Sequence, residues 1–272
     1  MKIKNKKFII TLLAVIALFA IAVIQIEGNC KMQENTRLTS SQGLSNKKIG
    51  WGIKRNDNHE QPDLGKVNKE ILEKNNGIAI GNNNDKCIYL TFDEGYEAGH
   101  TTQILSTLKE NNVKATFFIT AHYLNTQPDL VKQMIEEGHI VGNHTVNHKS
   151  MPSLTEEQIN SEVMDLHKAI YEKFGYEMKY IRPPMGEFSE KSITVTNSLG
   201  YKTVMWSFAY EDWNENKQPE ESAAKKKIID NVHNGEIMLL HGNSTTNTNI
   251  LGDIIKEIRN MGYEFKSLDE FK

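Results

Sequence analysis

The sequence predicts an α/β protein whose parallel strands curl into a distorted, incomplete (β/α) barrel. From Lys86 onward, short β-rich runs alternate with amphipathic helical patterns, which is typical of parallel strands joined by helical crossovers. No GxGxxG motif follows the first of these runs, whereas an open dinucleotide-binding sheet would be expected to carry one. Seven candidate strands therefore favour the incomplete barrel.

The elements of this barrel can be placed along the chain in order. The β-rich runs are residues 87–92, 115–119, 139–143, 180–182, 203–206, 236–240 and 264–266. Helical patterns fall between them at residues 101–111, 128–137, 155–174, 189–199, 222–232 and 250–261. Four of the helical patterns are followed at once by a glycine, at Gly138, Gly175, Gly200 and Gly262. Glycine is the residue that most often ends a helix, so these positions support the assigned helix ends.

The N-terminal residues predict attachment to a membrane. Residues 8–26 form an apolar stretch interrupted only by Thr11 and Gln25, and four lysines precede it. In a helix this stretch just spans a bilayer core, and the lysines place the N-terminus in the cytoplasm and the remainder of the chain outside. Cleavage of a signal peptide and secretion is the alternative, but no small-x-small cleavage site follows. We therefore expect residues 1–27 to be an uncleaved, single-pass anchor in the cell membrane.

Three regions follow the expected anchor. Residues 28–50 are rich in Asn, Ser, Gln and Lys and predict a polar stalk. Residues 51–85 are expected to extend the barrel domain at its N-terminal side, and residues 86–272 to form that domain. Four of the 32 basic residues and none of the 35 acidic ones precede Glu27, so the exported part carries 28 basic residues against 35 acidic ones, or −7. This charge and the lack of a clustered basic stripe argue against a nucleic-acid partner, and no protein partner is predicted.

Polar side chains follow five of the predicted strands. The first strand leads to Asp93-Glu94, the third to His144 and His148, the fourth to Arg182, the fifth to Asp212-Trp213 and the sixth to His241. Chemistry in such barrels takes place at the carboxyl ends of the strands. A single histidine after a strand is more often a hydrogen-bonded structural residue, but five polar motifs at one rim predict an active site.

Two adjacent carboxylates end the first predicted strand. If the strand continued through them, Asp93 and Glu94 would point to opposite faces of the sheet. Gly95 permits a sharp turn, so we expect the strand to stop at Phe92 and both acids to reach the same rim. On its own, so short a motif is more often a solvated turn after a strand.

The residue types at this rim suit metal-assisted hydrolysis. His144 and His148 are four residues apart, so one helical turn would place both on one face, where neutral imidazoles bind zinc. One of the two acids can then act as a metal ligand and the other as a general base.

The remaining polar residues can serve an acid and a base. Arg182 would keep one carboxylate ionised through charge-assisted hydrogen bonds. His241 could act as a general acid if Asp212 orients its ring.

The motifs TFDEG, HTVNH, RPPMG, EDW and LLH, in this order, resemble the five motifs of the polysaccharide deacetylases, carbohydrate esterase family 4, whose common domain is the NodB homology domain. The resemblance covers roughly residues 86–272. The WGIKR segment at residues 51–55 and the GYE after the first motif are similar to the subgroup that deacetylates N-acetylmuramic acid during muramic δ-lactam formation in the endospore cortex. The resemblance thus implies a metal-dependent hydrolase, with zinc as the metal, that acts on peptidoglycan glycan strands.

The resemblance also implies a role for each residue that matches a family motif. Its catalytic assignments are Asp93 as base, His241 as acid, Arg182 as the residue that holds the base, and Asp212 as the partner of the acid. Its binding assignments are His144 and His148 as metal ligands, the backbone N–H of Met185 as oxyanion donor, and Trp213 as an aromatic wall of the sugar groove.

The chain departs from the family at Glu94, where most members have an aspartate as the third metal ligand. Because glutamate is one methylene longer, its carboxylate reaches the metal only if the backbone or rotamer adjusts. We expect Glu94 to be a ligand; the alternatives are a bystander or a group behind a metal held by two histidines and solvent.

Other functions remain open from the sequence. The same motifs would serve a deacetylase of N-acetylglucosamine or of a surface polysaccharide. A catalytically inactive sugar-binding module with this fold is an alternative of a different class, but Asp93 and His241 are both present. A purely structural barrel would not be expected to carry five polar motifs at one rim.

Overall fold

The computed structural model describes residues 43–271 of the chain. Within it, the residues from Ser45 onward form one compact unit. The expected membrane anchor and most of the expected stalk lie outside the described residues. Among residues 43–271, no helix is both long enough and apolar enough to cross a bilayer.

Seven parallel strands form the sheet that the sequence predicts. They are β2 (Cys87–Glu94), β3 (Thr116–Ile119), β4 (Ile140–Asn143), β5 (Tyr180–Ile181), β7 (Lys202–Thr203), β8 (Glu236–His241) and β9 (Glu264–Phe265). Their order is β7-β5-β4-β3-β2-β8, and β9 pairs with the first residues of β2. Within the described part of the chain, isolated bridges alone, such as Ile78 with Val204 and Ile80 with Glu236, link the edges of the sheet. The prediction of an incomplete barrel is therefore confirmed.

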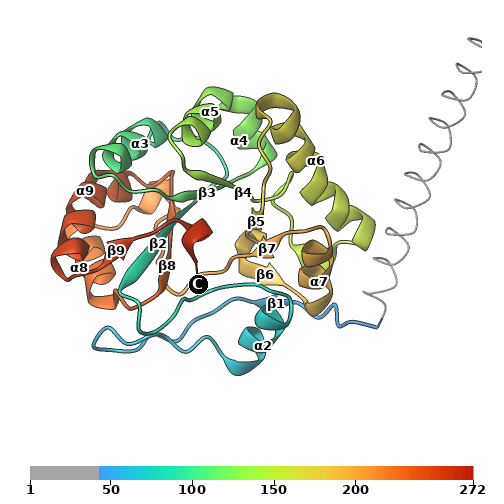
Figure 1. Ribbon diagram of the computed structural model, residues 1–272, viewed down its shortest axis with the longest axis horizontal. Helices are drawn as coiled ribbons and strands as arrows, with labels where there is room; N and C mark the ends of the chain where they lie inside the picture. Colours follow the sequence, from blue (N-terminus) through green and yellow to red (C-terminus); the bar gives the residue numbers. More distant parts are fainter. Residues whose placement is uncertain (1–42, 272) are drawn as a thin grey trace, which may run out of the picture. The chain divides into compact units, whose positions relative to one another are not determined.

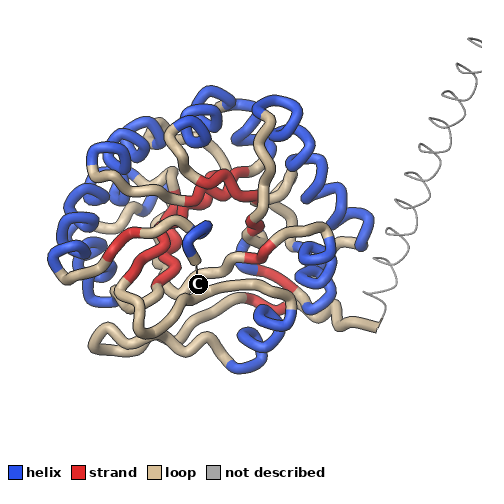
Figure 2. Tube along the Cα trace, in the orientation of Figure 1, coloured by secondary structure: helices blue, strands red, loops and turns tan. Residues whose placement is uncertain are grey.

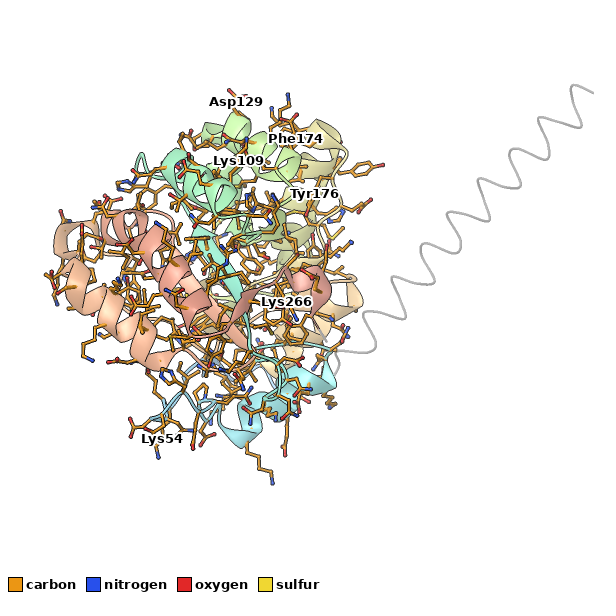
Figure 3. All side chains as sticks on the ribbon, turned by 60° about the vertical axis from the view of Figure 1, so that its left-hand side comes forward. Lys54, Lys109, Asp129, Phe174, Tyr176 and Lys266 are labelled. Carbon is orange, nitrogen blue, oxygen red and sulfur yellow. The ribbon has the colours of Figure 1, made fainter. Side chains whose placement is uncertain are left out.

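Helices cover the outside of the curled sheet (Figures 1 and 2). They are α3 (Thr101–Glu110), α4 (Ala121–Thr126), α5 (Pro128–Glu136), α6 (Glu156–Phe174), α7 (Glu190–Ser198), α8 (Glu221–Asn231) and α9 (Thr245–Asn260). Charged side chains such as Lys109 of α3 and Asp129 of α5 lie on the outer side of this layer (Figure 3). All six predicted helices are present. Helix α9 starts five residues earlier than predicted because the Ser244 side chain caps it, accepting a hydrogen bond from the N–H of Asn247 (3.2 Å).

Side chains of the central strands alternate between two apolar layers. Ile88, Leu90 and Phe92 of β2 pack in the large core between the sheet and the helices. Cys87 and Tyr89 of the same strand belong to a smaller cluster with residues such as Phe118 and Ile237. This period of two decides which residues at the end of each strand face the barrel interior and which face the helices. The thiol of Cys87 is buried and free.

The N-terminal extension packs against the barrel through a second, two-stranded sheet. Strand β1 (Ile49–Gly50) pairs antiparallel with β6 (Glu187–Phe188). The backbone N–H of Trp51 donates to the carbonyl of Gly186 (2.8 Å), and its indole N–H donates to the carbonyl of Trp206 (2.9 Å). The extension also contains α2 (Lys66–Lys74). The compact unit thus includes the last residues of the predicted stalk, from Ser45 onward.

We expect a protein lacking residues 1–44 to unfold at the same temperature as one lacking only residues 1–27, because the compact unit begins at Ser45. Removing residues 1–57 should lower the unfolding temperature by roughly 4–8 °C or more, since losing about 2 kcal/mol has that effect in a domain of this size. Differential scanning calorimetry would measure both. An equal unfolding temperature for the two truncations would contradict a stabilising role for β1 and Trp51.

Candidate active site

A cavity of about 1000 Å³ opens at the carboxyl ends of the strands. Its lining includes six of the residues singled out in the sequence: Asp93, His144, His148, Met185, Trp213 and His241. Strands β2 and β8 are neighbours, and their register pairs Asp93 directly with His241. The parallel sheet therefore brings together polar residues that are far apart in the chain.

A buried arginine holds the carboxylate of Asp93. Arg182 is fully buried and donates from Nη1 to Asp93 Oδ1 (2.8 Å). Its Nε donates to the carbonyl of Val204 (3.1 Å), and its guanidinium lies over the Phe118 ring at 4.3 Å. Burial alone would raise the pKa of Asp93, but Arg182 and then His144 outweigh it and lower that pKa. Asp93 is thus kept ionised at neutral pH.

The two histidines of the HTVNH motif face each other at a separation that would suit two ligands of one metal. Their Nε2 atoms lie 3.2 Å apart, and two nitrogens on one tetrahedral zinc would lie about 3.4 Å apart. His144 Nδ1 donates to the carbonyl of Arg182 (2.8 Å), which leaves its Nε2 unprotonated in the neutral ring. Burial lowers the pKa of His144 to about 4 and also lowers the pKa of His148. Both rings are therefore neutral, as metal binding requires.

The histidines converge without the helical turn that their spacing suggested. Residues after β4 form a loop rather than a helix. Thr145 (φ 70°) and His148 (φ 53°) both adopt the left-handed conformation. This part of the prediction is wrong, because a left-handed residue at each of these positions turns the chain back and brings the second ring over the first.

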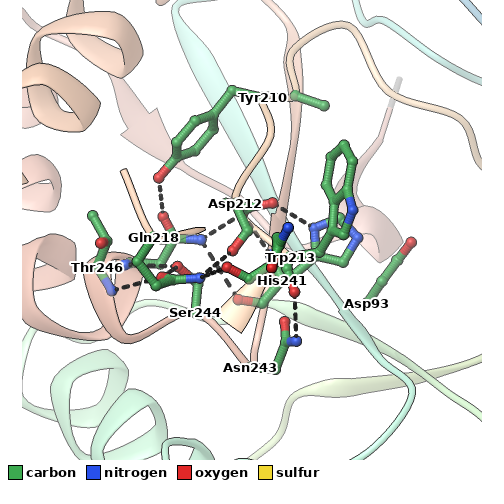
Figure 4. Close-up of polar contacts among 12 residues, drawn as sticks. Asp93, Tyr210, Asp212, Trp213, Gln218, His241, Asn243, Ser244 and Thr246 are labelled. Carbon is green, nitrogen blue, oxygen red and sulfur yellow. Dashed lines mark hydrogen bonds and ion pairs between the residues drawn. The ribbon is translucent and has the colours of Figure 1, made fainter. Parts of the chain in front are cut away.

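Asp212 holds the ring of His241. His241 Nδ1 donates to Asp212 Oδ1 (2.7 Å), while Asp212 Oδ2 accepts from the backbone N–H of His241 (3.0 Å) and from Asn247 Nδ2 (2.6 Å). Figure 4 shows Asp212, Trp213 and His241 together, with the hydrogen bonds between Asp212 and His241 as dashed lines. Burial would lower the pKa of His241, but the fully buried Asp212 outweighs it and raises that pKa. His241 is thus suited to donate a proton.

Glu94 does not join this group. Strand β2 runs on through Glu94 instead of ending at Phe92, so the expectation that Gly95 turns both acids to one rim is wrong. The alternation of β2 directs Asp93 into the cavity and Glu94 to the side of the sheet on which Phe92 packs against the helices. Within residues 43–271, no three His, Cys, Asp or Glu side chains form a group that could hold a metal. The structure therefore does not bring Glu94 into the cavity lining with the two histidines, where a third ligand was expected.

The carboxyl group of Glu94 is instead buried behind the site. The residue is 1% exposed, and neither side-chain oxygen has a hydrogen-bond partner among the described residues. A Cβ atom at Gly242 would lie 1.9 Å from Glu94 Oε1, so only glycine fits after His241. Burial, followed by the charges of Glu97 and Asp93, raises the pKa of Glu94 well above its usual value.

Two exposed side chains border the opening of the cavity. Met185 is 56% exposed and left-handed (φ 58°), in the short turn that follows Arg182. Trp213 is 51% exposed, and its ring centre lies 5.5 Å from that of His241. The structure therefore places both residues where they can contact a substrate bound over Asp93 and His241.

Residues outside the motifs support the site as well. Asn247 of α9 holds Asp212, and Asn243 Nδ2 donates to Tyr96 Oη (2.8 Å) and to the carbonyl of Trp213 (2.9 Å). Neither asparagine belongs to a recognisable pattern, because isolated amides in a polar loop or helix carry no sequence signal. The GYE after the first motif was the single hint at Tyr96.

An ionised carboxylate beside two facing imidazoles, with a third histidine opposite whose pKa is raised, is the set of groups that metal-assisted hydrolysis requires. The family model for polysaccharide deacetylase matches residues 80–204. The chain belongs to this polysaccharide deacetylase family, carbohydrate esterase family 4.

Individual relatives cover most of the chain. It is 42% identical over 231 residues to the peptidoglycan-N-acetylmuramic acid deacetylase PdaA of Bacillus subtilis, covering 85% of this chain and 88% of the relative. The solved structure of PdaA, described as a family 4 carbohydrate esterase, superimposes with a TM-score of 0.81 and 42% identity over 84% of this chain and 98% of that one. A peptidoglycan-N-acetylglucosamine deacetylase of Bacillus cereus is 34% identical over 69% of this chain and 89% of its own.

The Asp212→Asn variant should shift the pH dependence of hydrolysis. Because Asp212 raises the pKa of His241, the protonated acid is present at low pH and is lost as the pH rises through that pKa. Without the carboxylate the loss should occur at lower pH, and the rate at neutral pH should fall by about 10²-fold. The pH profile of kcat/KM for acetate release measures this, and an unmoved alkaline limb would contradict the role of Asp212.

The Glu94→Gln variant should bind metal with unchanged affinity, because the side chain points away from the histidines. It should also change the pH dependence of stability. The stability that the protonated carboxyl contributes is present below its ordinary pKa of 4.5 and is lost as the pH rises toward the higher folded value. Glutamine does not titrate in this range. The unfolding temperature of the variant, relative to that of the native protein, should therefore increase from pH 4 to pH 7. A weaker metal affinity would show that Glu94 is a ligand after all.

Proposed function

We propose that the protein hydrolyses the acetamido group of N-acetylmuramic acid in peptidoglycan glycan strands, for the formation of muramic δ-lactam in the spore cortex. The observation that carries the proposal is the pairing of Asp93, held by Arg182, with His241, held by Asp212, across neighbouring strands. The match to PdaA over 85% of the chain supports the choice of substrate.

Metal dependence is part of this proposal, and zinc is the metal we favour because imidazole suits it. His144 and His148 would hold the ion, and their facing, neutral Nε2 atoms fit it. When bound, the metal would supply Lewis-acid polarisation of the substrate carbonyl.

The residues of the chain divide the proton transfers between them. Asp93 accepts a proton from the attacking water, which forms the new C–O bond to the acetyl carbon. Arg182 occupies Asp93 Oδ1, so Oδ2, which lies 3.5 Å from His144 Nε2, is the oxygen that faces the reaction. The C–N bond then breaks, and His241 Nε2 donates a proton to the leaving amine while Asp212 stabilises the Nδ1–H. Acetate and a free sugar amine result.

The two exposed residues at the opening would bind the rest of the substrate. The backbone N–H of Met185 is our candidate donor to the developing oxyanion, and the Trp213 ring offers an apolar face for a sugar. We further propose that residues 1–27 anchor the protein in the cell membrane, with the hydrolase domain on the outer side.

The substrate test compares peptide-free glycan strands, intact peptidoglycan and chitin oligomers by released acetate. Lactam closure needs a free amine on carbon 2 and a free lactyl carboxylate on carbon 3 of one sugar, so deacetylation should be fastest on peptide-free strands. Asp93→Asn should reduce the rate by about 10²-fold or more without changing the fold, because it removes the base. Acetate from chitin oligomers alone would favour an N-acetylglucosamine deacetylase instead.

A further inference from the structure

The loop that carries the two metal-binding histidines, residues 144–148, is strained. Thr145 and His148 lie in the left-handed region, with φ of 70° and 53°. This region is unfavourable for any residue with a Cβ atom and most unfavourable for a β-branched one such as threonine. Strain of this kind persists only where the surroundings hold the backbone firmly. The bonds that hold this loop therefore decide whether the rings meet.

Each backbone N–H from residue 145 to residue 148 has a partner. Thr145 N–H donates to Asn143 Oδ1 (2.8 Å), and His148 N–H donates to Thr145 Oγ1 (3.0 Å). The two N–H groups between them both donate to a single residue of α6, Glu162. Val146 N–H donates to the backbone carbonyl of Glu162 (3.0 Å), and Asn147 N–H donates to Glu162 Oε2 (2.7 Å).

The carboxylate of Glu162 also accepts a hydrogen bond from the side chain of Asn147 in the loop. Asn147 Nδ2 donates to Glu162 Oε1 (2.8 Å), so the two carboxylate oxygens take one backbone and one side-chain donor from Asn147. Glu162 is 4% exposed, and Lys149 Nζ lies 3.4 Å from Oε1. A buried carboxylate with two such bonds is a firm attachment, since hydrogen bonds to a charged acceptor are stronger than neutral ones.

Glu162 acts from behind the loop rather than on the substrate. It lines a separate hollow of about 320 Å³ on the α6 side, shared with Val146 and Asn147, and it is not part of the lining of the catalytic cavity. One end of the loop is fixed by the bond from His144 Nδ1 to the carbonyl of Arg182. Glu162 fixes the other end, directly before His148.

We propose that Glu162 is a positioning residue that holds His148 against His144 in the arrangement that binds the metal. The proposal rests on the proposed metal dependence of the enzyme. Without both carboxylate bonds, the loop can relax out of the left-handed conformation at residue 148. The two Nε2 atoms would then separate from 3.2 Å, and the affinity of the pair for a divalent ion would fall.

The test measures zinc affinity of the metal-free protein by competition with a chromogenic chelator, in the absence of any glycan. Glu162→Gln should bind zinc about 10–100-fold more weakly, the usual cost of losing a partner behind a metal ligand. Glutamine offers only one acceptor oxygen, and its NH₂ group would face a donor of Asn147. Circular dichroism and the unfolding temperature would establish that the fold is retained.

The matched control is Asp165→Asn. Asp165 lies one helical turn further along α6, is exposed and lines the same hollow. Its substitution changes the charge by the same amount, and Asp165 has no hydrogen bond to residues 144–148 among the described contacts. Zinc affinity should be unchanged, and an equal loss in both variants would overturn the proposal in favour of a general charge effect.

Two further outcomes are decisive. Native zinc affinity in a folded Glu162→Gln protein would overturn the proposal while leaving the proposed function intact. Failure of the native protein to bind zinc would contradict the metal-dependent function and this inference together. If Glu162→Gln does not fold, Asn147→Ala removes only the side-chain bond to Oε1. That variant should bind zinc more weakly than the native protein, and equal affinity would again overturn the role of Glu162.

Discussion

The buried pair of Arg182 and Asp93 is the interaction on which the rest of the site depends. Removing both charges from water is costly, and such a pair seldom stabilises a fold more than apolar residues would. Its value is functional, because the arginine keeps the carboxylate ionised inside the barrel. The guanidinium also bonds the carbonyls of Val204 and Met205 and lies over Phe118. One side chain thus ties the end of β2 to the chain that follows β7.

The sheet supplies the remaining geometry through its register and its alternation. Asp93 and His241 are partners across β2 and β8, so the register of the sheet brings the base next to the acid, and Asp212 then orients the ring of His241. The same alternation turns Glu94 away from the cavity into a buried position against Gly242. The metal-binding pair, by contrast, depends on a strained loop, and that loop depends on Glu162 of a helix behind it.

Much of the fold and of the site could be predicted from local patterns. All seven strands of the large sheet and six of the eight α-helices within residues 43–271 were expected near their observed positions, because a buried parallel strand is a continuous apolar run and its helix has a polar face. The polar residues that follow five of these strands could also be recognised in the sequence. Two predictions were wrong: that β2 ends at Phe92, and that His144 and His148 lie on one helical turn. Gly95 permits a turn but does not impose one, and a four-residue spacing suits a left-handed loop as well as a helix.

The sequence by itself determined the element order, and with it the rim at which Asp93, His144 and His241 gather, because parallel strands end on the same side. Only the tertiary structure decided which face of β2 each acid occupies, and which residues hold the histidines and Asp212 in place. Glu162 and Asn247 act through single hydrogen-bond geometries across elements distant in the chain. Such contacts depend on distance and direction in space, and neither is encoded in a local pattern of residues.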